Sequence, residues 1–116
     1  MDKNLGELTT VEDLTRALHE SRERPVLLFK HSLTCAISTR AFSELQSYLA
    51  KADPRISYKL ITVQTARAVS DEAADKLRLP HESPQAILVR NGSEIWNASH
   101  SDITVSALDQ AIRNTD

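Results

Sequence analysis

The feature that most constrains the fold is a change of hydrophobic period between residues 25 and 54. Val26-Leu27-Leu28-Phe29-Lys30 follows Pro25 as a short, nearly continuous apolar run, which is typical of a strand covered on both faces. From Ala36 onward the apolar residues recur at helical spacing on one stripe, which ends before Pro54: Ile37, Ala41, Leu45, Tyr48, Leu49 and Ala52. A buried strand followed by a long helix indicates an α/β protein in which helices cover a central sheet.

The segments on either side extend this pattern over the chain. We expect one domain spanning 1–116, with a short edge strand near 6–8, helices at 10–20, 66–77 and 105–112, and strands at 56–63, 86–89 and 94–96. The stretch from Thr9 to Asp13 predicts a capping box for the first helix, and Asp102 or Thr104 is expected to cap the last. Asn91-Gly92 favours a two-residue hairpin turn, so the last two strands should be antiparallel. The order predicts a mixed sheet with helices on both faces, as in thioredoxin-like domains.

Charge and composition exclude several classes of partner. Lys and Arg total 14 against 16 Asp and Glu, and the two signs are interleaved, so we expect neither nucleic acid nor an anionic membrane as a partner. No apolar run approaches the roughly 20 residues that cross a bilayer, and no secretion signal is evident. We therefore expect a cytoplasmic protein. The acidic cluster Asp71, Glu72 and Asp75 has no nearby His or Cys, so we expect a solvated helix face and no metal.

Cys35 is the only cysteine, so any disulfide that it forms is intermolecular. It lies between the apolar strand and the long helix, where unpaired backbone N–H groups and the helix dipole favour an anion such as a thiolate. Ser38 follows three residues later, and its hydroxyl is expected to approach the sulfur. Serine can donate a hydrogen bond to a thiolate but cannot form a disulfide, so the pattern predicts a monothiol site.

Pro84 is the second informative position, because it stands immediately before a strand expected beside the first apolar one. A proline there can carry a cis peptide bond after Ser83, or it can be an ordinary trans proline at the start of a strand. In the cis form, the backbone of Ser83 is expected to face the sulfur and pair with an extended partner chain.

Together these residues resemble the thioredoxin superfamily and, more closely, the monothiol bacilliredoxin family. The resemblance rests on Phe29-Lys30-His31-Ser32, Thr34-Cys35-Ala36-Ile37-Ser38, Ser83-Pro84-Gln85 and the Asn91-Gly92 turn. It implies that Cys35 removes a low-molecular-weight thiol, bacillithiol, from mixed disulfides on client proteins, with an external thiol or a reductase needed for release. No bound cofactor is implied, because the small thiol is a co-substrate. One departure is Ala36, where such motifs commonly have proline.

The hypothesis of thiol-disulfide exchange at Cys35 assigns roles to the neighbouring residues. Cys35 and Ser38 would be catalytic, Ser83 and Pro84 would position the incoming disulfide, and Thr34 would shape the entrance. His31 and Lys30 would add positive potential beside the sulfur or contact an acidic thiol. The alternative for both is a side chain at a strand end, in solvent or in packing.

Three other interpretations remain open. Cys35 can be an inert, small core residue. It can belong to a thioredoxin-like binding or adaptor module without redox turnover, in which the groove recognises a partner. It can also hold an iron-sulfur cluster together with glutathione, as in some monothiol glutaredoxins, although those carry glycine and phenylalanine where this chain has Ala36-Ile37.

Overall fold

The computed structural model describes residues 4–115, and residues 1–3 and 116 of the predicted domain lie outside the described residues. Its five strands form one mixed sheet in the order β1-β3-β2-β4-β5. The strands are β1 (Leu5–Glu7), β2 (Val26–His31), β3 (Ser57–Thr62), β4 (Gln85–Arg90) and β5 (Ser93–Ser99). The central strand β2 runs parallel to β3 and antiparallel to β4. The predicted mixed sheet is therefore confirmed.

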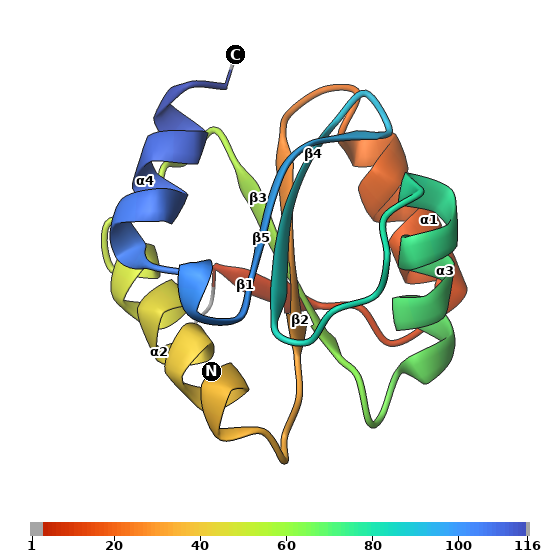
Figure 1. Ribbon diagram of the computed structural model, residues 1–116. Helices are drawn as coiled ribbons and strands as arrows, with labels where there is room; N and C mark the ends of the chain where they lie inside the picture. Colours follow the sequence, from red (N-terminus) through yellow and green to blue (C-terminus); the bar gives the residue numbers. More distant parts are fainter. Residues whose placement is uncertain (1–3, 116) are drawn as a thin grey trace.

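Four α-helices cover the sheet in pairs, and a short 3-10 helix joins β5 to the last of them. They are α1 (Val11–Glu20), α2 (Ala36–Leu49), α3 (Arg67–Leu77), η1 (His100–Asp102) and α4 (Val105–Arg113). Figure 1 shows α1 and α3 on one face of the sheet and α2 and α4 on the other. No helix in the described range 4–115 is long and apolar enough to cross a membrane.

The apolar run of β2 fills two cores, one on each face of the sheet. Val26 and Leu28 pack with the core under α1 and α3, whereas Leu27 and Phe29 pack with the core under α2 and α4. Successive side chains of a strand point to opposite faces, so a strand covered on both sides needs apolar residues at every position. This alternation also fixes the faces of Lys30 and His31, which end the strand.

Local signals set most of the element boundaries. Thr10 and Asp13 form the predicted capping box, because the Thr10 hydroxyl accepts from the Asp13 amide and the Asp13 carboxylate accepts from the Thr10 amide. Asn91 and Gly92 have φ angles of 55° and 75°, as the predicted hairpin turn requires. Of the two candidate caps for α4, the structure selects Thr104, whose hydroxyl accepts from the Ala107 amide at 3.0 Å.

The end of α2 differs from the prediction. The apolar stripe continues to Ala52, but the α-helix ends at Leu49. The amides of Lys51 and Ala52 donate to the carbonyls of Tyr48 and Leu49, three residues earlier, at 2.9 and 3.3 Å. The last apolar residue of the stripe therefore follows the helix in a tighter turn, a common way for a helix to end.

Candidate functional site

Cys35 stands where β2 leads into α2, and it is the N-cap residue of that helix. Its backbone is extended, with φ −109° and ψ 122°, and its carbonyl accepts from the amide of Thr39 at 3.1 Å. The side chain is partly exposed, and in the part of the chain that the structure describes it makes no capping hydrogen bond. The first turn of α2 carries no acidic residue. An anion at this sulfur would therefore face unpaired helix amides without a competing carboxylate.

Ser38 is bound differently from the prediction. Its side chain is fully buried, and its Oγ accepts from the Ser32 amide at 2.8 Å and lies 2.9 Å from His31 Nδ1. Within residues 4–115 no hydrogen bond joins this hydroxyl to the Cys35 sulfur, so the expected contact is not present. The Ser32 amide is the partner of this hydroxyl instead, because the loop before Cys35 folds back over the first turn of α2. Ser38 thus fixes the loop that leads to the cysteine.

His31 completes this arrangement on the same face of the sheet. Its ring stacks on Phe42 of α2, with 4.6 Å between centroids and 26° between planes. Burial lowers the pKa of His31 below its ordinary value of 6.5. A neutral ring whose Nδ1 accepts from the Ser38 hydroxyl fits both observations, since that hydroxyl already accepts from an amide. His31 therefore supports the loop, and its lowered pKa disfavours the positive charge predicted for it.

Gln64, which follows β3, holds the same loop from the side, and the sequence analysis missed it. Its Oε1 accepts from the Leu33 amide at 3.0 Å, and its Nε2 donates to the hydroxyls of Ser32 and Thr34 at 2.8 and 3.3 Å. The exposed side chain of Thr34 thus lies immediately before Cys35 in a loop that is braced by a neighbouring strand. The parallel pairing of β2 with β3 was the available signal, because it places the residues after both strands at one edge.

The Ser83–Pro84 segment lies at the same edge of the sheet. The peptide bond between the two residues is cis, one of the two forms that the sequence analysis left open. Lys30 pairs with Gln85 across β2 and β4, so buried Pro84 stands one position further on, beside the residues that lead to Cys35. The Ser83 hydroxyl is buried and has no hydrogen-bond partner among the described residues. The structure thus brings the cysteine loop and the proline loop together.

Lys30 is not on the surface of this site. Its side chain is fully buried and points to the α1 and α3 face, where its Nζ lies 3.2 Å from His81 Nδ1. The Ser70 hydroxyl of α3 lies 3.3 Å from the same His81 nitrogen, Nδ1. Burial lowers the Lys30 pKa from 10.5 to about 8, and the charge of Asp71 opposes this shift. The strand alternation directs the Lys30 side chain away from His31 and into a polar cluster under the proline loop, and its contact with a substrate stays a prediction.

Two exposed apolar side chains flank Cys35. Leu33 is 59% exposed and Ile37 is 48% exposed, and both belong to the short segment that contains the cysteine. Large apolar side chains that stay exposed around a functional group often mark a surface that contacts another molecule.

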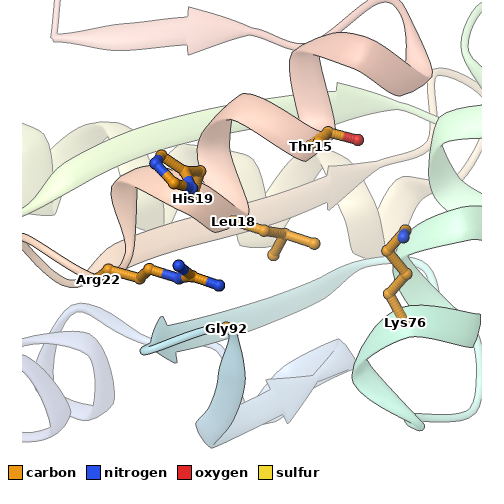
Figure 2. A pocket seen from close by; sticks show the side chains of 6 residues that line it. All are labelled: Thr15, Leu18, His19, Arg22, Lys76 and Gly92. Carbon is orange, nitrogen blue, oxygen red and sulfur yellow. The ribbon is translucent and has the colours of Figure 1, made fainter.

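A cavity of about 370 Å³ lies at the other end of the sheet. Figure 2 shows its lining, contributed by α1 and the turn that follows it, the end of α3 and the hairpin turn: Thr15, Leu18, His19, Arg22, Lys76 and Gly92. Gly92 follows the end of β4, which pairs with the beginning of β2, whereas Cys35 follows the end of β2. This cavity is therefore remote from the cysteine.

A sheet of this order, with a cysteine at the start of α2 and a cis proline at the neighbouring strand, defines a protein of the thioredoxin fold. One solved protein, described provisionally as an oxidoreductase with a thioredoxin fold, is 34% identical, with a TM-score of 0.82 and 93% of each chain covered. The chain belongs to the monothiol bacilliredoxin family, because the family model for monothiol bacilliredoxin BrxC matches residues 6–108. Both family and fold identify a thiol oxidoreductase, whose partners are thiols or protein disulfides.

More distant structures share the fold alone. The thioredoxin of Fasciola hepatica is 18% identical, with a TM-score of 0.75 and coverage of 96% of this chain and 99% of its own. Mitochondrial thioredoxin 3 of Saccharomyces cerevisiae is 16% identical, with a TM-score of 0.69 and coverage of 96% and 95%. The predicted thioredoxin-like fold and the resemblance to the monothiol bacilliredoxin family are both confirmed.

Proposed function

We propose that this protein removes a low-molecular-weight thiol, bacillithiol, from mixed disulfides on client proteins, with Cys35 as the nucleophile. The observation that carries the proposal is the environment of the only cysteine. Cys35 is partly exposed at the start of α2, and the position of a second, resolving cysteine is taken by Ser38, which is buried and hydrogen-bonded elsewhere. Such a site can accept one sulfur and cannot close an internal disulfide.

The reaction then has two exchange steps. The Cys35 thiolate attacks the sulfur of the small thiol in the mixed disulfide, a new disulfide forms between Cys35 and the small thiol, and the client leaves as a thiolate. The client cysteine is thereby reduced, and Cys35 is oxidised. A second thiol from solution, or the thiol of a reductase, attacks the small-thiol sulfur of the Cys35 adduct. This releases Cys35 as a thiolate and the small thiol as a disulfide with the attacking thiol.

The neighbouring residues have supporting roles in this proposal. Ser83 and Pro84 would position the incoming disulfide, since they lie at the same sheet edge as the cysteine loop and the Ser83 hydroxyl is without a partner in the described residues. Thr34 would shape the entrance from the exposed side of the loop. Exposed Leu33 would contact the client beside the reacting cysteine.

Intact-mass analysis tests this function directly. The protein is mixed with a bacillithiolated client under anaerobic conditions, and the mass of each chain is followed with time. We expect the wild type to gain the mass of one bacillithiol residue as the client loses it, and Cys35→Ala to gain nothing. A wild type that keeps its mass while the client remains modified would support a binding module without redox turnover. A purified protein with the absorption of an iron-sulfur cluster would support the cluster carrier.

A further inference from the structure

A second cavity, of about 260 Å³, lies between the start of α2 and the segment that joins β5 to α4. The α2 wall consists of one helical stripe that begins two residues after Cys35: Ile37, Arg40, Ala41 and Glu44. The facing wall comes from η1 and the residues before α4: His100, Ser101, Ile103 and Thr104. Its volume is slightly below the range of about 300–1,000 Å³ typical of sites for drug-sized ligands. It therefore suits a small molecule better than a protein segment.

Both walls are connected to the site described above. The α2 wall continues the helix that Cys35 caps. On the other wall, the His100 amide donates to the Pro84 carbonyl at 3.1 Å, and His100 Nε2 lies 3.7 Å from the Glu82 carboxylate. The cavity is thus placed between the helix that presents the cysteine and a segment bonded to the proline loop.

The two charged side chains of the α2 wall, Glu44 and Arg40, differ in whether they already have a partner. The Glu44 carboxylate accepts from the Val105 amide at 2.9 Å, so it serves the start of α4. Arg40 is exposed, and no carboxylate of the described residues lies within ion-pair distance of its guanidinium. Lys30 and His31, the cations expected from the sequence, face the other core or bind Ser38. Arg40 is therefore the cation of this cavity that remains available, and a guanidinium binds carboxylates in a two-pronged geometry.

We propose that this cavity holds the body of the small thiol during exchange at Cys35, and that Arg40 selects small thiols that carry a carboxylate. The inference rests on the proposed function, because it concerns the same exchange step. The hydroxyls of Ser101 and Thr104 would form hydrogen bonds with hydroxyl groups of the ligand. The side chains of Ile37 and Ile103 give the cavity its apolar surface. The client chain would then lie on the Leu33 side of the cysteine, outside the cavity.

The test compares two mixed disulfides of one client protein, one with glutathione, which carries two carboxylates, and one with neutral 2-mercaptoethanol. The rate of transfer to Cys35 is measured by quenching and intact-mass analysis. We expect Arg40→Gln to slow transfer from the glutathione disulfide by about tenfold, the size of one charge-assisted contact. Transfer from the mercaptoethanol disulfide should be unchanged. Arg22→Gln is the matched control, because it removes the same charge at the remote cavity of Figure 2.

The outcomes separate the inference from the function on which it rests. If Arg40→Gln and the wild type handle both disulfides at equal rates, the cavity does not select the thiol, although Cys35 still performs the exchange. If Arg22→Gln slows the glutathione reaction as much as Arg40→Gln does, long-range charge explains the selectivity and the inference is wrong. If the wild type gains mass from neither client, the proposed exchange itself fails.

Discussion

Replacing Ser38 by alanine distinguishes a serine that holds the loop from one that acts on the sulfur. The Ser38 side chain is fully buried, and its hydroxyl connects the Ser32 amide to His31 Nδ1. Alanine removes this oxygen, so the Ser32 amide and His31 Nδ1 both lose a hydrogen-bond partner. We expect Ser38→Ala to fold, to unfold more readily than the wild type, and still to accept the small thiol at Cys35.

The expected loss in the free energy of unfolding follows from the two hydrogen bonds that Ser38→Ala removes. A buried polar group left without a partner costs about 1–3 kcal/mol. The Ser32 amide and the His31 ring are only half-buried, so water can replace part of what is lost. Alanine also favours a helix over serine by up to about 0.5 kcal/mol, which offsets a little of the cost. The free energy of unfolding should therefore fall by about 2 kcal/mol.

Urea unfolding followed by circular dichroism measures this loss, and Ser43→Ala is the matched control. Ser43 lies on the same helix but is exposed, so its replacement should change stability by less than about 0.5 kcal/mol. A loss below about 0.5 kcal/mol for Ser38→Ala would refute the structural role. A variant as stable as the wild type that no longer gains the small thiol would show that the hydroxyl acts on the sulfur.

Three further changes test the parts around the site. Burial lowers the Lys30 pKa from 10.5 to about 8, so between about pH 8 and 10.5 the unfolded chain binds more protons than the folded chain. The free energy of unfolding should therefore rise with pH in this range. Between pH 7 and 9 the wild type should gain about 1 kcal/mol relative to Lys30→Met in urea unfolding, and parallel pH profiles would contradict this. Gln64→Ala should speed hydrogen exchange of the Leu33 amide by about tenfold, and an unchanged rate would mean that another group protects that amide. Thr10→Ala, which removes the capping box of α1, should cost about 1 kcal/mol of thermal stability, and an unchanged melting temperature would exclude this contribution.

The parts of the fold that the sequence predicts well are those with a strong local cause. The continuous apolar run of β2 identifies a strand buried on both faces, and the structure uses successive residues such as Leu28 and Phe29 in opposite cores. The Asn91-Gly92 turn determines the hairpin, because few other pairs adopt two positive φ angles so readily. The cysteine at the start of α2 follows from the change of period at Ala36.

The site was predicted less completely, because its contacts depend on strand register and on competition between partners. The alternation of β2 already implies that Lys30 and His31 point to opposite faces, which the sequence analysis did not use. The hydrogen-bond partner of Ser38 could not be predicted from the sequence. The spacing places its hydroxyl near the sulfur, but it does not show how the loop before Cys35 folds back. Gln64 follows β3 at the same distance as Leu33 follows β2, a match that only the pairing of the strands makes visible.

The two adjacent residues at the end of β2 explain how one cysteine is held for exchange without a second. On the α2 face, His31 bonds to Ser38 and so anchors the loop that carries Cys35. On the other face, Lys30 bonds to His81 and so anchors the loop that leads to Pro84. Because neighbouring residues of a strand cannot move independently, the cysteine loop and the proline loop are held in one relative position. Under the proposed function, in which Cys35 keeps a small thiol until a second molecule arrives, such a fixed site is an advantage, since each exchange step requires the attacking sulfur to reach the disulfide in line.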